Sequence, residues 1–273
     1  MLRATVSALA LSLLSSSAFA AEKVPVKPTT GDALPPAIVG DAGPLAGESV
    51  GYFADDEKAQ GYLAIPEGDG PFPAVILIHE WNGLVDRVKE TADSFAAEGY
   101  VALAADLYSS RTGSNPQENM ALVRETLAAP ETIIANLDAA VKFLEARTDT
   151  TGKVATIGWC YGGGVALSYA LGSEHHDGTA IFYGRLLADP TEIAKIHHPV
   201  YGTFVEKDQG IPLDTVNAFV EAMRGAGIEN DVHIYDAVRH GFWLHVDRDP
   251  ETNTPAAIDA WKRLKTYLKK VLG

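Results

Sequence analysis

The chain contains, near its middle, the segment Val154-Ala155-Thr156-Ile157-Gly158-Trp159-Cys160-Tyr161-Gly162-Gly163-Gly164, around which the rest of the sequence is organised. Its first half is an apolar run typical of a buried strand, and a helical pattern follows from about Tyr161 to Leu171. The pattern Gly-x-Cys-x-Gly spans the turn between them, as in the strained strand-to-helix turn that exposes a nucleophile. The small glycines allow strand and helix to approach each other. We therefore predict that Cys160 is a nucleophile at a helix N-terminus, which favours the thiolate.

Two other interpretations of this segment have to be weighed. A Gly-rich turn before a helix can bind phosphate, but this one lacks both the Gly-Lys-Ser/Thr ending of a P-loop and the G-x-G-x-x-G spacing of a dinucleotide site. Cys160 is the only cysteine, so it cannot form an internal disulfide, and it could simply be a small buried hydrophobic residue.

Strand and helix patterns alternate on both sides of this segment. Two short alternating stretches, Ser49–Ala54 and Gln60–Pro66, come first. The strands expected after them are Ala74–Ile78, Val101–Ala105, Val154–Gly158, Thr179–Tyr183, Val200–Val205 and Val232–Tyr235. The expected helices span residues 85–98, 117–128, 131–146, 161–171, 213–225 and 255–271. This order predicts an α/β fold, with one mostly parallel central sheet and helices on both faces.

The N-terminus has the features of a bacterial signal peptide. Arg3 precedes an apolar run from Ala8 to Leu14, and Ala18-Phe19-Ala20 offers a cleavage site before Ala21. We expect residues 1–20 to be removed and the protein to be periplasmic or secreted. Residues 21–47 are rich in Pro and Gly, which is typical of an extended tether or a loosely packed arm. Residues 48–273 then form a single domain.

The composition restricts the partners of the mature protein. The chain has 22 Lys and Arg against 36 Asp and Glu, and the segment 1–20 contains one Arg, which leaves 21 − 36 = −15 after cleavage. Such a charge argues against nucleic acid and anionic membranes as partners. The adjacent pairs His175-His176 and His197-His198 lack zinc-site spacing, so we expect no metal, and nothing implies a dissociable cofactor. A small-molecule substrate and a monomer are favoured, although the sequence leaves the oligomeric state open.

A base and an acid follow Cys160 in the order that its chemistry requires. Asp208 comes after the strand that ends near Val205, and His240 comes after the strand that ends near Tyr235. Glu206 is a rival for the acid role, and His240 could instead be a structural histidine. We expect His240 to lie within hydrogen-bond reach of Cys160, with Asp208 behind the imidazole. Glu80, just past the first buried strand, should reach the same edge of the sheet.

Five separated motifs together resemble the dienelactone hydrolase family, which has the α/β-hydrolase fold. They are Gly158–Gly163, His79–Gly83, Asp106–Tyr108, Glu206–Asp208 and Arg239–Phe242, and the resemblance runs from about residue 50 to the C-terminus. It implies a triad of Cys160 as nucleophile, His240 as base and acid, and Asp208 as its orienting group. It also implies that Glu80 is a catalytic residue, which contacts the resting thiol and helps to generate the thiolate when substrate arrives. The backbone N–H groups of Tyr161 and Trp81 would form the oxyanion hole.

The sequence departs from the family pattern in two places. Family members that act on dienelactone hold its carboxylate with arginines, and Arg111 could be one of them. A second arginine is expected shortly after the histidine, but Phe242-Trp243-Leu244 stands there, so Trp243 suggests a less charged substrate. The signal peptide is the other departure, since lactone hydrolases of aromatic catabolism are usually cytoplasmic.

Two function hypotheses follow. The leading one is hydrolysis of a carboxylic ester or lactone through a thioacyl-enzyme intermediate at Cys160. The alternative is a non-catalytic periplasmic ligand-binding or thiol-sensing protein on the same fold.

Overall fold

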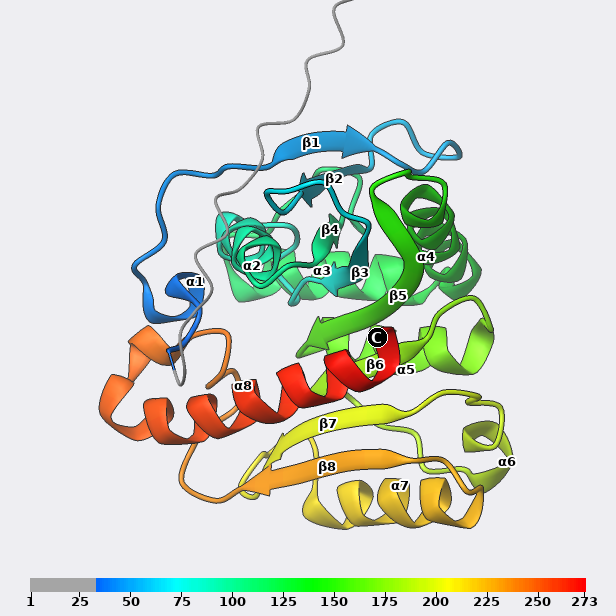
Figure 1. Cartoon of the computed structure of the whole chain (residues 1–273). Helices are drawn as coiled ribbons and strands as arrows, with labels where there is room; N and C mark the ends of the chain where they lie inside the picture. The colour runs from blue at the N-terminus through cyan, green and yellow to red at the C-terminus, as the bar shows by residue number, and fades with distance from the viewer. Residues whose placement is uncertain (1–32) are drawn as a thin grey trace, which may run out of the picture.

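The computed structural model describes residues 33–273, so the predicted signal peptide and residues 21–32 of the arm lie outside the described part. An eight-stranded sheet in the order β1-β2-β4-β3-β5-β6-β7-β8 forms the centre of the described chain (Figure 1). The strands are β1 (Glu48–Gly51), β2 (Gln60–Ala64), β3 (Phe72–Ile78), β4 (Val101–Ala105), β5 (Thr150–Trp159), β6 (Gly178–Phe182), β7 (Val200–Val205) and β8 (Asn230–Tyr235). The pairs β1–β2 and β2–β4 are antiparallel and the other pairs are parallel, as the α/β prediction required.

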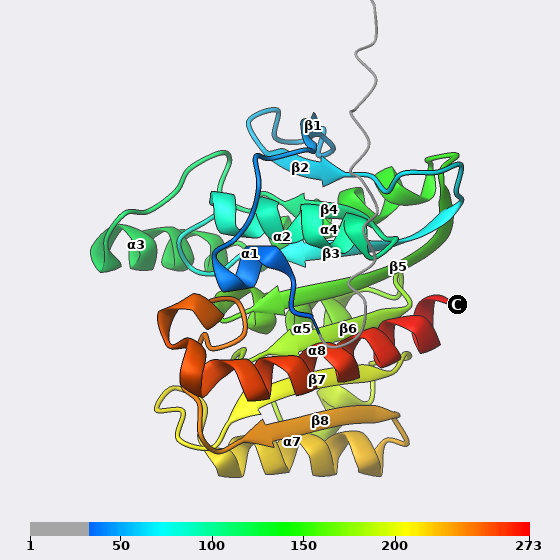
Figure 2. The same ribbon diagram turned by 60° about the vertical axis from the view of Figure 1, so that its left-hand side comes forward.

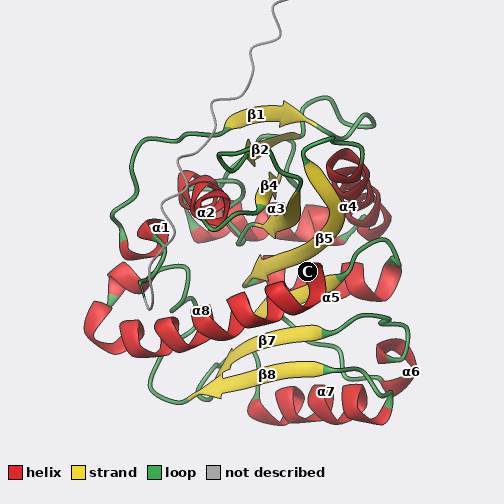
Figure 3. Cartoon of the chain, viewed as in Figure 1, coloured by secondary structure: helices red, strands yellow, loops and turns green. Residues whose placement is uncertain are grey.

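Helices cover both faces of this sheet (Figures 2 and 3). They are α1 (Pro36–Val39), α2 (Asp86–Ala97), α3 (Pro116–Leu127), α4 (Pro130–Glu145), α5 (Tyr161–Gly172), α6 (Pro190–Ile193), α7 (Leu213–Gly225), the 3₁₀ turn η1 (Val246–Arg248) and α8 (Pro250–Leu272). The central strands are apolar on both faces. Val75 and Leu77 pack in one core with α2 and α8, whereas Ala74 and Ile76 pack in a second core with α4 and α5. Neighbouring strand residues point to opposite faces, which explains the continuous apolar runs.

Most element boundaries agree with the sequence prediction, and β4, β7 and α7 have the predicted bounds. The clearest difference is α8, which begins at Pro250 rather than at residue 255. The Asp249 side chain accepts a hydrogen bond from the Thr252 N–H at 3.4 Å, and Pro250 occupies the first helical position, where its missing N–H is no loss. The helices α1 and α6 were not predicted, because four residues are too few to show a helical period.

The described part of the arm is not a loose tether. The side chains of Ala37 and Ile38 in α1 are fully buried in the core that contains α2. Arg87 of α2 donates hydrogen bonds to the Ala37 carbonyl and to Asp247 of η1. The helix α1 is therefore an integral part of the domain, lying against α2 and η1. No helix within residues 33–273 combines the length and the hydropathy needed to cross a membrane.

We predict that Ile38→Ala lowers the free energy of unfolding by about 2–4 kcal/mol, because it removes a buried side chain and leaves a cavity. The neighbouring Val39 is 38% exposed, so Val39→Ala should change the free energy by less than about 0.5 kcal/mol. Urea unfolding of both variants measures the difference. Equal stability of the two variants would show that the arm does not dock in solution.

Candidate active site

The backbone at Cys160 is strained and is held by close packing. Cys160 lies between β5 and α5 with φ 56° and ψ −115°, a conformation that costs roughly 1–3 kcal/mol for a non-glycine residue. A Cβ atom on Gly158 would stand 2.0 Å from the Gly162 carbonyl oxygen, and one on Gly162 would stand 2.2 Å from the Ile78 carbonyl oxygen. Both positions thus require glycine. The same contacts bring the end of β3 against the first turn of α5.

The Cys160 sulfur faces two backbone donors. The N–H groups of Tyr161, at the start of α5, and of Trp81, in the loop after β3, donate hydrogen bonds to it and favour the thiolate. Burial of the thiol and the charge of Glu80 have the opposite and larger effect, so the pKa of Cys160 is raised to about 12. The N–H group at the helix start favours the thiolate, as we expected. In this resting arrangement desolvation and Glu80 outweigh that effect, so the thiol stays protonated.

His240 and Asp208 form a hydrogen-bonded pair at the same edge of the sheet. The His240 Nδ1 lies 2.7 Å from Asp208 Oδ2. The Asp208 side chain is 5% exposed, whereas the His240 side chain is 40% exposed and does not point into the core. Of the two acids that the sequence left open, Asp208 contacts the imidazole, and Glu206 is exposed. If the Nδ1–H donates to the carboxylate, Nε2 remains available as a base.

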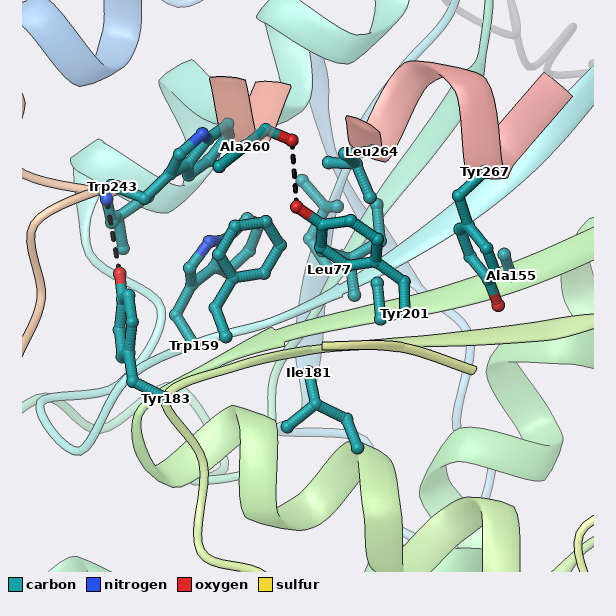
Figure 4. Packing of buried hydrophobic residues seen from close by; sticks show 14 of the residues in the cluster. Leu77, Ala155, Trp159, Ile181, Tyr183, Tyr201, Trp243, Ala260, Leu264 and Tyr267 are labelled. Atoms are coloured by element: carbon teal, nitrogen blue, oxygen red, sulfur yellow. Dashed lines mark hydrogen bonds between the residues drawn. The ribbon is translucent and has the colours of Figure 1, made fainter. Parts of the chain in front are cut away.

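The structure does not show the hydrogen bond that we expected between the thiol and the imidazole. Within residues 33–273, no hydrogen bond joins Cys160 to His240, because the sulfur is directed toward the N–H groups of Tyr161 and Trp81. The ring of Tyr183, the residue after β6, packs on the imidazole with 4.9 Å between centroids. Its hydroxyl accepts a hydrogen bond from the Leu244 N–H at 3.3 Å (Figure 4).

Glu80 lies beside the thiol but bonds to another residue. Its Oε2 is 2.7 Å from the Nε2 of His245, and both side chains are largely buried. The neighbouring His79 is fully buried, and its two ring nitrogens contact the Glu80 carbonyl at 2.7 Å and the Leu107 N–H at 3.3 Å. Burial lowers the pKa of His79, so the ring is neutral and fixes the backbone from which the Glu80 side chain projects.

A protein-family model identifies the family of the chain. The model of the dienelactone hydrolase family matches residues 59–272, which include every part of the site described above. The chain belongs to the dienelactone hydrolase family. It is accordingly an ester or lactone hydrolase with the α/β-hydrolase fold.

Individual relatives agree with this membership. A Methylorubrum extorquens protein named as a carboxymethylenebutenolidase is 30% identical over 276 residues, covering 96% of this chain and 91% of its own. A protein of the same name from Aquifex aeolicus is 30% identical and covers 82% of this chain and 100% of its own. Among solved structures, a Klebsiella pneumoniae protein described as a dienelactone hydrolase has a TM-score of 0.71 at 24% identity, covering 82% of this chain and 98% of its own.

The two residues that we expected to bind substrate differ in their surroundings. Arg111 is 49% exposed and hydrogen-bonds to the Glu125 carboxylate and the Tyr108 carbonyl, so its role in substrate binding stays a prediction. The expectation for Trp243 is wrong. Trp243 is fully buried, and its ring stacks on Trp159 with 5.7 Å between centroids (Figure 4). It therefore supports the turn at Cys160 from beneath and offers no surface to a substrate.

The sequence did not predict a role for two residues near the site. His245 follows His240 by five positions, and only the fold shows that it meets Glu80 across 165 positions of sequence. Arg248 lies beside the loop after β8, where a Cβ on Gly241 would be 3.9 Å from its guanidinium. Its charge also lowers the pKa of Tyr183, although burial keeps that pKa high. Neither residue belongs to a recognisable motif.

One histidine of each adjacent pair contacts the same threonine, away from Cys160. His176 Nε2 and His198 Nε2 lie 2.9 and 2.8 Å from the Thr179 hydroxyl. Burial lowers the pKa of His176 to about 3 and that of His198 to about 4. Among the described residues, no three His, Cys, Asp or Glu side chains are grouped so that they could hold a metal ion.

This histidine cluster should make the fold sensitive to acid. The unfolded chain binds protons at these positions below about pH 6.5, whereas the folded protein does so only near the lowered pKa values, so stability is lost as the pH falls from 6.5 toward 4. We predict that His176→Phe reduces the slope of unfolding free energy against pH by about 1.4 kcal/mol per unit in this window. The exposed His197→Gln should change the slope much less, because His197 has only a minor electrostatic effect on His198. Urea unfolding between pH 4 and 7 measures it, and a wild-type slope in His176→Phe contradicts the assignment.

Proposed function

We propose that this chain hydrolyses a carboxylic ester or lactone through a thioacyl intermediate on Cys160. The observation that carries the proposal is the convergence of three parts at one edge of the sheet. These are a cysteine on a strained turn, two backbone N–H groups that face its sulfur, and an imidazole backed by a buried carboxylate. Each part has a role in acyl transfer, and no part is explained by packing alone.

The first half of the reaction forms the thioester. The Cys160 thiol turns toward His240, and Nε2 accepts its proton while Asp208 stabilises the imidazolium. The sulfur attacks the carbonyl carbon, and the carbonyl oxygen takes the place that the sulfur leaves beside the N–H groups of Tyr161 and Trp81. The carbon–oxygen bond to the leaving group then breaks, and the imidazolium returns the proton to the departing alkoxide.

The second half hydrolyses the thioester. Water attacks the acyl carbon as His240 Nε2 accepts one of its protons, and the same two N–H groups stabilise the oxyanion. The carbon–sulfur bond breaks, the thiolate is released, and it regains the proton from the imidazolium. In a lactone substrate the alcohol stays attached to the acid, so one hydroxy acid is the product.

The non-catalytic alternative has no support. A thiol sensor needs a thiolate that oxidants can reach, but burial and Glu80 raise the pKa of Cys160 to about 12. The thiol becomes a nucleophile only with the help of a base, which the pair His240–Asp208 can provide.

We predict that wild-type protein gives a burst and turnover with p-nitrophenyl acetate, and that Cys160→Ala lowers kcat by at least about 10³-fold. Iodoacetamide should abolish wild-type activity. The reason is that Cys160 is the only cysteine of the chain and the only group here that can carry the acyl. A parallel assay on cis-dienelactone tests a charged lactone substrate.

The two acids after β7 give a matched control. Asp208→Asn should reduce kcat by about 10²- to 10⁴-fold, whereas Glu206→Gln, at an exposed position in the same loop, should retain the wild-type rate. Negligible rates in the wild type, equal to those in Cys160→Ala across several esters and the lactone, contradict the proposed function.

We also propose that the protein acts outside the cytoplasm, on the strength of the signal-peptide pattern in residues 1–20. Expressed with its native N-terminus in a Gram-negative host, it should be released by osmotic shock with Ala21 as its first residue. A chain that lacks residues 2–20 should stay in the cytoplasm. Retention of the full-length, uncleaved chain in the cytoplasm contradicts the proposal.

A further inference from the structure

The Glu80 carboxylate has a partner that the proposed reaction has not used. Its contact with His245 is 2.7 Å long, and the two side chains are 12% and 11% exposed. An ion pair or hydrogen bond at that depth is poorly screened by solvent, so the proton state and position of one partner affect the other strongly.

In the substrate-free arrangement, the Glu80 carboxylate opposes ionisation of the Cys160 thiol. After burial, its charge is the largest cause of the raised pKa of Cys160. The proposed reaction needs a thiolate in the same pocket, and two negative charges then lie close together. A donor that offsets the Glu80 charge therefore makes the thiolate easier to form, and His245 is the side chain that donates to Glu80.

His245 is held so that it can do this. Its backbone N–H donates to the Gly241 carbonyl at 3.2 Å, and its carbonyl accepts from the Asn253 side chain of α8 at 3.4 Å. Gly241 directly follows His240. The contact between Glu80 and His245 thus ties the loop after β3 to the loop that carries the proposed base.

We propose that His245 is a positioning residue for the proposed thiol chemistry: it holds the Glu80 carboxylate by a donated hydrogen bond and offsets its charge, so that Cys160 can ionise. This inference deepens the proposed function and rests on it. His245 acts through Glu80 and does not contact the reacting atoms.

Several other ionisable groups lie around the pair and the thiol, so a pH profile has to be assigned by comparison of variants. They are Cys160 at the start of α5, His79 after β3, Asp106 and Tyr108 after β4, Tyr183 after β6, Asp208 after β7, His240 after β8, and Arg248 in η1. A change that His245 variants cause only while Glu80 is charged belongs to the pair and to none of these groups.

The test measures the rate of Cys160 alkylation by iodoacetamide between pH 6 and 10, in the full chain without substrate. His245→Leu should react about tenfold more slowly at neutral pH, with its profile moved about one unit higher, since one pKa unit is tenfold in thiolate. His245→Gln keeps a donor and should restore most of the rate. Glu80→Gln should react about tenfold faster than wild type, with its profile moved lower.

The double variant Glu80→Gln/His245→Leu decides the mechanism. In the absence of the Glu80 charge, His245→Leu should change the alkylation rate by less than about twofold, as a thermodynamic cycle for a coupled pair requires. The exposed His175→Leu serves as a control, and thermal melting shows that each variant folds. An equal effect of His245→Leu with and without the Glu80 charge overturns the proposal, as does slower alkylation of Glu80→Gln.

Alkylation does not depend on ester turnover, so the two proposals can fail separately. If the wild type hydrolyses no ester but the alkylation pattern holds, the proposed function fails and the role of His245 stands. If the wild type hydrolyses esters but Glu80 and His245 variants alkylate at its rate, the role of His245 fails alone.

Discussion

The contact of backbone against backbone between β3, β5 and the start of α5 is the constraint on which the site depends. With no side chain at Gly158 or Gly162, the first turn of α5 rests on the β3 carbonyl of Ile78. This closeness forces Cys160 into its strained conformation, and it brings the N–H groups of Trp81 and Tyr161 to one sulfur. The stacked rings of Trp159 and Trp243 fill the core beneath the turn, so the Cys160 backbone has no space into which it could relax.

Two opposite electrostatic effects act on the Cys160 thiol. Burial and the charge of Glu80 keep the thiol protonated, while the helix start and two N–H groups favour its anion. The thiol is therefore protonated and unreactive without substrate, and it becomes a nucleophile when a base accepts its proton. The pair His240–Asp208 has the geometry for that step, and the half-exposed imidazole lies where a substrate can reach it.

The sequence was most informative where chemistry and local structure share one short motif. The turn at Cys160, the strand ends and the order of Asp208 and His240 could all be read from patterns of two to ten residues. The depth of a side chain could not be predicted from such patterns, so Trp243 was expected to face substrate although it lies in the core. The meeting of Glu80 with His245 depends on the packing of distant loops, which no local pattern records.

The placement of α1 has a consequence for the order in which the domain is completed. Its Ala37 carbonyl and Asp247 of η1 share one arginine, Arg87, and 160 positions separate Arg87 from Asp247. Because the chain is synthesised from its N-terminus, Arg87 can contact Asp247 only after most of the domain has been made. The contact from Arg87 to Asp247 therefore forms late in synthesis, although Arg87 and Ala37 emerge early.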